Sequence, residues 1–267
     1  MYRGFELNIN DWDIAAYHSQ GIQVFDFFKP KVTSVLDSYI KANKALDGAK
    51  MQEDWFPAVN ADIFISHSSA DKDFALCLAG WLYKHFNITA FIDSMIWGYA
   101  DELLLDIDNR KCKNDQTGYY IYKLRNHSTS HIHVMLATAL TKMIDKTECF
   151  FFINTGNSIT IEDSITDPYT YSPWIYSELE MSRLVRKKEL SDYRAKISKI
   201  RMFSLNEIRM ISENVEITHK VDLEHLTKLS KEDFKVWLQL DAEEKLQYPI
   251  GHLYELRPLE KLKIVLS

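Results

Sequence analysis

Apolar positions along this chain follow two patterns that alternate, short runs of strand length and stripes with helical spacing. The runs at 61–66, 88–93 and 148–154 are rich in aromatic and β-branched residues and have the length of buried strands. Between the first two runs, apolar positions repeat at intervals of three and four, as on the buried face of a helix. That stripe contains Phe74, Cys77, Leu78, Trp81, Leu82 and His85. Strands that alternate with helices predict βαβ units around a parallel sheet.

The same alternation continues toward the C-terminus. Apolar periodicity predicts helices at 132–143 and 233–240 and another that begins after Ser172, which can cap it. Apolar runs predict a fourth strand at 200–205 and a possible fifth at 215–221. The expected fold class is therefore α/β, with a flavodoxin-like parallel sheet of four or five strands led by residues 61–66 and flanked by helices.

Three segments lie outside this alternation. Residues 1–60 carry one amphipathic stripe (Val24, Phe28, Val35 and Ile40 belong to it), which predicts an N-terminal helical extension packed on the domain. Residues 94–126 look like an irregular insertion and contain the aromatic patch Tyr-Tyr-Ile-Tyr at 119–122. Residues 224–267 are expected to form a C-terminal helical or irregular extension. The domain itself is therefore expected to span residues 61–223.

The charge and the cysteines indicate which partners the protein binds and in which cellular compartment it lies. The net charge is −6, and no block of basic residues stands out, because the nearest one shares its helix with acidic residues. A nucleic-acid partner is therefore not expected. The three cysteines never form a CxxC pair, the N-terminus has no apolar signal region, and no apolar run reaches the length of a membrane span. These features predict a cytoplasmic protein with no membrane partner.

One helix carries a candidate catalytic residue. In the segment after Ser172, Glu178 shares a face with Trp174, Met181 and Val185, whereas Glu180 lies on the opposite face. A carboxylate in an apolar stripe costs free energy unless it is paired or lines a cleft. Glu178 is therefore either a functional carboxylate or one that pairs with a lysine or arginine at the edge of the stripe.

The predicted topology brings a second polar group close to this glutamate. In flavodoxin-like sheets, ligands bind beyond the carboxyl ends of the strands, where the strand order reverses. Residues 66–68 (Ser-His-Ser) follow the first predicted strand, and Trp174 and Glu178 follow the third. Ser68 fits equally well as a simple helix cap.

These motifs, in this order, resemble those of TIR domains. The sequence DIFIS followed by HSSAD at 62–71 resembles their opening strand, and AFID at 90–93 resembles the strand before their BB loop. The segment SPWIYSEL at 172–179 resembles the helix that carries the catalytic glutamate of NAD-cleaving members, and 217–223 resembles the closing segment of bacterial ones. The insertion at 94–126 is longer than usual for the family and leaves the position of Trp97 open.

The resemblance implies an enzyme that cleaves the nicotinamide–ribose bond of NAD, by hydrolysis or by cyclisation to an ADP-ribose-derived signal. NAD is then a substrate, no other cofactor is needed, and Glu178 is the catalytic residue. It also implies a role in bacterial antiphage defence (Thoeris-like systems), self-assembly, and a separate effector that reads the product. The residues expected to bind the substrate are Ser66, His67, Ser68, Asp93, Trp97 and Trp174.

Two other functions remain open, a non-catalytic TIR scaffold and a nucleotide-binding sensor without turnover. No metal site is expected. His127 and His131 have the spacing of helical metal ligands, but no carboxylate or cysteine is evidently paired with them.

Overall fold

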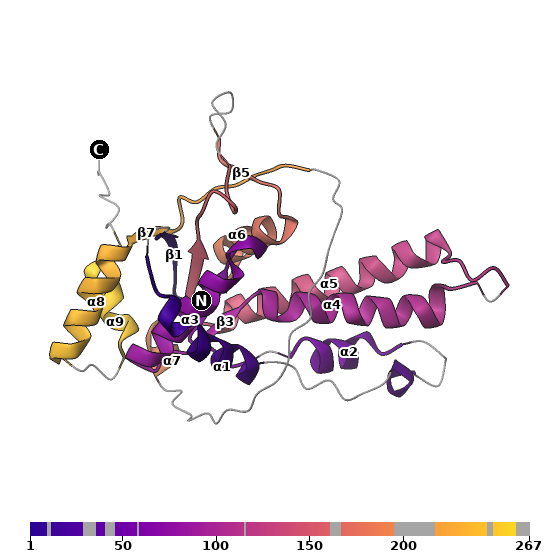
Figure 1. Cartoon of the computed structure of the whole chain (residues 1–267), viewed down its shortest axis with the longest axis horizontal. Coiled ribbons are helices and arrows are strands. Elements are labelled where there is room, and N and C mark those ends of the chain that lie inside the picture. The colour runs from indigo at the N-terminus through magenta and orange to yellow at the C-terminus, as the bar shows by residue number, and fades with distance from the viewer. Residues whose placement is uncertain are drawn as a thin grey trace, which may run out of the picture.

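The computed structural model describes residues 1–9, 12–28, 36–40, 46–57, 59–114, 116–160, 167–194, 217–244 and 248–259. These residues form an α/β fold around a five-stranded parallel sheet with the order β3-β2-β4-β1-β7 (Figure 1). Its strands are β1 (Arg3–Asn8), β2 (Ile63–Ser66), β3 (Ala90–Ile92), β4 (Cys149–Ile153) and β7 (Thr227–Ser230). The expected flavodoxin-like fold class is confirmed.

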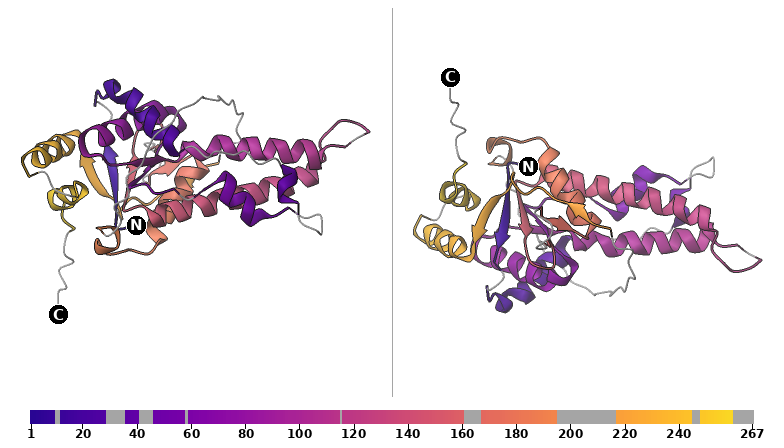
Figure 2. Two further views of the ribbon diagram at one scale, coloured as in Figure 1. Left: turned by 90° about the horizontal axis from the view of Figure 1, so that it is seen from below. Right: turned by 90° about the horizontal axis from the view of Figure 1, so that it is seen from above.

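Helices flank this sheet and extend beyond it on one side (Figures 1 and 2). They are α1 (His18–Phe28), α2 (Gly48–Trp55), α3 (Lys72–Phe86), α4 (Ser94–Ile107), α5 (Tyr122–Lys146), α6 (Pro173–Leu184), α7 (Ser191–Arg194), α8 (Lys231–Glu244) and α9 (Ile250–Leu256). Short 3-10 turns occur at Ala15–Tyr17, Leu36–Tyr39 and Ser69–Asp71, and a π-helical turn at Asp108–Cys112 follows α4. Strands β5 (Tyr169–Thr170) and β6 (His219–Lys220) form a separate antiparallel pair.

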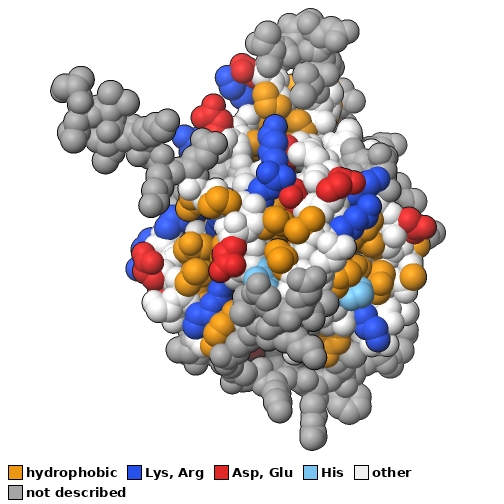
Figure 3. All heavy atoms as spheres, turned by 90° about the vertical axis from the view of Figure 1, so that its left-hand side faces the viewer, with side chains coloured by type: hydrophobic (Ala, Val, Ile, Leu, Met, Phe, Trp, Pro, Cys, Tyr) orange, Lys and Arg blue, Asp and Glu red, His pale blue; other side chains and the backbone are white. Residues whose placement is uncertain are grey.

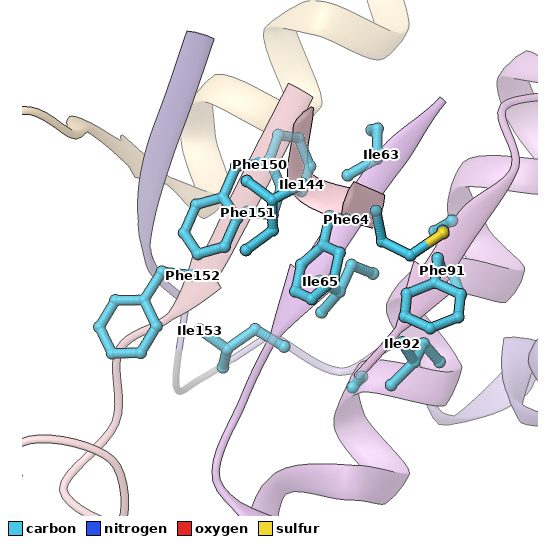
Figure 4. Close-up of a cluster of buried hydrophobic side chains, with 14 of the residues drawn as sticks. Ile63, Phe64, Ile65, Phe91, Ile92, Ile144, Phe150, Phe151, Phe152 and Ile153 are labelled. Carbon is cyan, nitrogen blue, oxygen red and sulfur yellow. The ribbon is translucent and has the colours of Figure 1, made fainter. Parts of the chain in front are cut away.

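The centre of the core lies on β2, β3 and β4, whose apolar side chains interlock across the sheet (Figure 4). Phe64, Phe91 and Phe150 lie side by side on neighbouring strands, with ring centroids 5.4 and 5.7 Å apart from that of Phe64. Every residue of these strands is buried, as parallel strands covered on both faces require. The strands predicted at 61–66, 88–93 and 148–154 are thus confirmed with slightly shorter bounds.

The two faces of the sheet are covered by different helices. Ser66 and Phe152 are paired positions on one face, which α6 covers through Glu178. The neighbouring Phe151 points to the opposite face and contacts Phe234 of α8, and α3 lies on that side because its Trp81 contacts the same phenylalanine. The first face therefore carries the candidate site.

The N-terminal segment differs from its prediction. Residues 1–60 were expected to be a helical extension, but Arg3–Asn8 form β1, which lies inside the sheet between β4 and β7. The prediction of a buried stripe is right for Val24 and Phe28, whereas Ile40 is 40% exposed and Val35 lies outside the described residues. The helical pattern concealed β1 because its polar residues Arg3, Glu6 and Asn8 made it look unlike a buried strand.

The C-terminal part of the sheet also differs. The fourth strand predicted at 200–205 lies outside the described residues. Within the range 215–221, His219–Lys220 form β6, which pairs with β5 and not with the main sheet. The segment predicted as a C-terminal extension supplies β7 at the edge of the sheet, followed by α8, which confirms the helix predicted at 233–240.

The insertion predicted to be irregular is helical in the structure. Asp93 is followed directly by α4, and α5 begins at Tyr122, ten residues before the predicted helix at 132. The two helices run side by side as a hairpin that projects from the sheet (Figures 1 and 2). The first turns of α5 could not be predicted because most of residues 122–131 face solvent and show no apolar period.

Two glycines allow α1 and α3 to pack in close contact. A Cβ atom on Gly21 would lie 1.9 Å from the carbonyl oxygen of Leu76, and one on Gly80 would lie 2.1 Å from that of Tyr17. Glycine is therefore required at both positions for the backbones to approach this closely.

Hydrophobic, basic and acidic side chains intermix on the face opposite the hairpin, where α8 and α9 lie (Figure 3). No single class of side chain dominates the visible part of it. Within the described ranges, no helix is both long and apolar enough to span a bilayer.

Candidate functional site

Helix α6 carries Glu178 on its inward face. The helix begins at Ser172, whose Oγ accepts a hydrogen bond from the backbone N–H of Ile175 at 3.2 Å, and Pro173 occupies its first turn. The buried face consists of Ile175, Glu178, Leu179 and Ser182. The prediction that Glu178 faces the core is therefore confirmed, and its side chain has no solvent exposure.

Ser66 is the partner of Glu178. It is the last residue of β2, and its Oγ donates a hydrogen bond of 2.6 Å to Oε2 of Glu178. Both residues are fully buried. This bond joins the carboxyl end of a central strand to the second turn of α6, where a doubly wound sheet binds its ligands.

Asp93 and His67 form the other half of the cluster. Asp93 follows β3, and its carboxylate accepts the backbone N–H of Ser94 at 2.6 Å and that of His67 at 3.3 Å. Nδ1 of His67 lies 2.5 Å from Oδ1 of Asp93, and both side chains are fully buried. Ser66, His67, Asp93 and Glu178 thus form one buried polar cluster, which we call the carboxylate cluster.

Burial controls the protonation of this cluster. It lowers the pKa of His67 to about 4, so the imidazole is neutral at physiological pH. It raises the pKa of Asp93, and it raises the pKa of Glu178 well above the usual range, to which the neighbouring Asp93 contributes further. Two like charges cannot both persist at such a site, so the two carboxyl groups hold at least one proton between them.

The hydrogen bonds indicate which carboxyl group holds that proton. Asp93 accepts two backbone N–H groups, those of His67 and Ser94, which favour its ionised form. Glu178 receives the hydroxyl of Ser66 on Oε2, but none of the described residues donates to its buried Oε1. A proton on Glu178 also allows it to hydrogen-bond to Asp93. Burial raises the pKa of Asp93 to about 8, and Glu178 keeps its proton to higher pH than Asp93 does.

Trp97 covers the cluster from the first turn of α4. Its ring is stacked nearly parallel to the imidazole of His67, with ring centroids 5.9 Å apart and planes 8° apart. Trp97 itself is half-buried, and its indole N–H has no hydrogen-bond partner among the residues described here. Of the predicted substrate-binding residues, Ser66, His67, Asp93 and Trp97 are thus brought together with Glu178.

Two of the predicted residues have other partners. Oγ of Ser68 accepts the backbone N–H of Ala70 at 3.3 Å, which is the helix-cap alternative raised by the sequence. Trp174 lies one turn before Glu178, half-buried, with its ring edge-on to His133 of α5 at 5.6 Å.

Sequence analysis missed a further buried carboxylate, Glu6 of β1. Glu6 occupies the same cross-strand row as Phe152 and Ser66, on the face that α6 covers. Its Oε1 accepts a hydrogen bond of 2.6 Å from Nδ2 of Asn154, at the carboxyl end of β4. Polar and apolar residues alternate in 3–8, which is the pattern of a strand, and that pattern could have identified both β1 and Glu6.

Other polar clusters of the described chain do not form part of this site. A groove of about 750 Å³ lies at the end of α5 and beyond α6, near the amino end of β4, and Glu178 does not line it. Its lining is mainly basic and includes Lys142, Arg186 and Lys187. In the ranges that the structure describes, no three His, Cys, Asp or Glu side chains are arranged to hold a metal ion.

The arrangement can do a limited kind of chemistry. One carboxylate at the end of a central strand can stabilise a developing positive charge once it is ionised, and a flat indole beside it can support a ring.

Comparisons of the chain with protein-family models, with curated proteins and with solved structures found no match.

Proposed function

We propose that this chain is a TIR-type enzyme of the cytoplasm that binds NAD and cleaves its nicotinamide–ribose bond, with Glu178 as the catalytic carboxylate. One observation carries the proposal. Glu178 is fully buried at the carboxyl end of the sheet, its carboxyl group is hydrogen-bonded to Ser66, and burial and the charge of Asp93 raise its pKa well above the usual range. Perturbed carboxyl groups of this kind gather at functional sites.

The reaction needs few protein groups. The carbon–nitrogen bond breaks with its electron pair going to the cationic nicotinamide, which leaves as a neutral molecule. The ribose becomes an oxocarbenium-like cation, as in glycoside hydrolysis. Water, or a second nucleophile within the ADP-ribose, then adds to that carbon and loses a proton. An ionised Glu178 stabilises the cation by its charge.

The proton on Glu178 gives the substrate a role in its own activation. A neutral carboxyl group cannot stabilise the cation by charge, so Glu178 must ionise before the bond breaks. The positive charge of the bound nicotinamide favours that ionisation, because an opposite charge lowers the pKa of a neighbouring carboxyl group. The charge is thus formed when the substrate is in place.

Access to Glu178 sets a further requirement. Ser66, His67, Asp93 and Glu178 are all fully buried. NAD therefore reaches the cluster only when the first turn of α4, which carries Trp97, moves away from His67. Closure of the site over its substrate would then exclude water and strengthen the electrostatic contacts.

The test is nicotinamide release from NAD by the purified full chain, with Glu178→Gln as the variant. Glutamine keeps the size of the side chain and removes the charge, so turnover should fall by roughly 10²–10³, the usual effect of losing one preorganised electrostatic contact. NAD binding should weaken less, because the charge matters most in the transition state.

Glu180→Gln is the matched control, because Glu180 lies on the same helix but is not part of the buried face. It should turn over NAD like the parent. If Glu178→Gln is as active as the parent, Glu178 has no catalytic role.

Complete burial of the cluster favours a second candidate, a TIR scaffold or nucleotide-binding sensor without turnover. In that case the cluster holds α6 to β2 and β3 and takes part in no reaction. Calorimetry separates the alternatives: a scaffold binds no NAD, and a sensor binds NAD and releases no nicotinamide. Self-assembly, an effector that reads the product and a role in antiphage defence also belong to the proposal, on the resemblance alone.

A further inference from the structure

The end of the α4–α5 hairpin carries a group of exposed aromatic and apolar side chains, in the segment 109–125 that we call the hairpin tip. Tyr119 and Tyr122 are 78% and 79% exposed, and Tyr120, Ile121 and Leu124 are about two-fifths exposed. Single exposed apolar residues are ordinary, but a contiguous group of them marks an interaction surface.

The backbone fixes the placement of these side chains. Lys113 and Tyr120 form a β-bridge, and the N–H of Ile121 donates to the carbonyl of Cys112 at 2.7 Å. The hydroxyl of Tyr120 donates to Asn109 at 2.6 Å. In contrast, no described residue makes a ring contact with, or a hydrogen bond to, the side chain of Tyr119 or Tyr122, although the backbone N–H of Tyr119 donates to Oγ1 of Thr117 at 3.4 Å. The hairpin tip therefore presents two rings to solvent on a defined turn.

The hairpin tip is also basic. It contains five basic residues and one acidic residue, a net charge of +4 in a chain whose net charge is −6. Arg110 pairs with Asp106 and Arg125 with Asp108. Lys111, Lys113 and Lys123 are exposed and form no ion pair with the described part of the chain. Lys111 and Lys113 precede the turn, Lys123 follows the aromatic patch, and the bridge between Lys113 and Tyr120 joins the two sides.

We propose that the hairpin tip binds the surface of a membrane that contains anionic lipids. The tip is the convex end of an arm that projects from the body of the protein (Figures 1 and 2). Tyrosine side chains settle at the headgroup level of a bilayer, lysines extend toward the headgroups, and anionic lipids attract them. Single-stranded nucleic acid is instead bound along a basic groove with stacking platforms, which a convex tip lacks.

This inference does not depend on the proposed enzymatic function. It revises the expectation that the chain has no membrane partner, which followed from the lack of a long apolar run in the sequence. A peripheral contact needs no such run, because a few rings and lysines at one turn suffice.

The test is sedimentation of the full-length protein with vesicles of phosphatidylcholine alone and with mixed vesicles of phosphatidylcholine and phosphatidylserine in equal parts. The parent should bind the mixed vesicles, and high salt should weaken the binding. The triple variant Lys111→Gln, Lys113→Gln, Lys123→Gln should bind roughly 100-fold more weakly, from the attraction that each lysine loses. The double variant Tyr119→Ser, Tyr122→Ser should bind about tenfold more weakly.

Val236→Ser on α8 removes an exposed apolar side chain far from the hairpin tip and should bind like the parent. The hairpin-tip variants should keep the parent's thermal unfolding, because the altered side chains are exposed. The proposal is overturned if the parent binds neither kind of vesicle, if it binds both equally, or if the hairpin-tip variants bind as the parent does. Binding of a nucleic acid or an acidic protein through the same residues, without vesicle binding, overturns it as well.

Discussion

At the residue scale, the complete burial of Glu178 carries a cost to stability. Its pKa is raised well above the usual range by burial and by Asp93, so the native state holds its proton more tightly than the unfolded state does. As the pH rises above 4.5, the ordinary pKa of a glutamate, the unfolded chain loses that proton first. Stability therefore falls with rising pH until the native carboxyl group also ionises.

Replacing the glutamate should remove this dependence. We expect Glu178→Gln to be stabilised relative to the parent by an amount that grows with pH above 4.5, at up to about 1.4 kcal/mol per pH unit. Urea unfolding of both proteins at a series of pH values gives that difference directly. A difference that stays constant with pH would show that Glu178 titrates alike in the native and unfolded states.

If the proposed NAD cleavage takes place, Asp93 should control the pH at which activity rises. If turnover needs an ionised Glu178, activity rises with pH through the raised pKa of that group. Asp93→Asn removes the neighbouring negative charge that helps to raise it, so the rise in kcat/KM, which reports the pKa of the free protein, should move to lower pH. Glu180→Gln should leave the midpoint in place. An unmoved midpoint in a folded Asp93→Asn variant would mean that the two carboxyl groups are not coupled.

At the element scale, the approach of α1 to α3 depends on two positions without a side chain. A methyl group at Gly80 would lie 2.1 Å from the carbonyl oxygen of Tyr17 and 2.6 Å from the nitrogen of Gly21. Both are backbone atoms, which cannot rotate away as the end of a side chain can. The two helices would have to separate.

Gly80→Ala should therefore destabilise the protein by at least about 1–3 kcal/mol, the usual cost of overpacking. Gly156→Ala is the control, because a Cβ there meets no atom within 4 Å. Denaturant midpoints of the two variants measure the contrast. Equal midpoints would show that α1 and α3 adjust freely.

The same scale explains which elements could be predicted from the sequence. Strands β2 and β4 are wholly apolar or nearly so, and their runs identified them. Strands β1 and β7 carry Arg3, Glu6 and Lys228, so the pattern of a buried strand was absent. The cluster of Ser66, Asp93 and Glu178 followed from motif and topology. The stacking of Trp97 on His67 could not be predicted, because the sequence pattern of 94–126 does not indicate the helix α4 that carries Trp97.

At the scale of the whole molecule, the segment 61–223 is not a complete fold. It lacks both β1, which pairs with β4, and β7, which pairs with β1. Without them β4 becomes an exposed edge whose side chains are apolar throughout. Exposed hydrophobic edge strands promote aggregation.

A fragment limited to 61–223 should therefore aggregate, whereas the full chain should remain dispersed under the same conditions. Size-exclusion chromatography with light scattering measures both. A fragment that elutes as a folded monomer, with a cooperative thermal transition, would show that the three remaining strands of the main sheet are sufficient.

The place of β1 in the sheet also determines when folding can be completed. Arg3 pairs with Cys149 and Phe5 with Thr227, so during synthesis β1 waits for the partners on both of its sides. Strands β2, β3 and β4 can assemble earlier with the helices between them, but the sheet closes only when β7 has been synthesised. Pairings between such distant residues carry a high loop-closure entropy and slow folding. The nascent protein thus keeps β1 unpaired until β4 has been synthesised, and keeps the second edge of β1 unpaired until β7 follows.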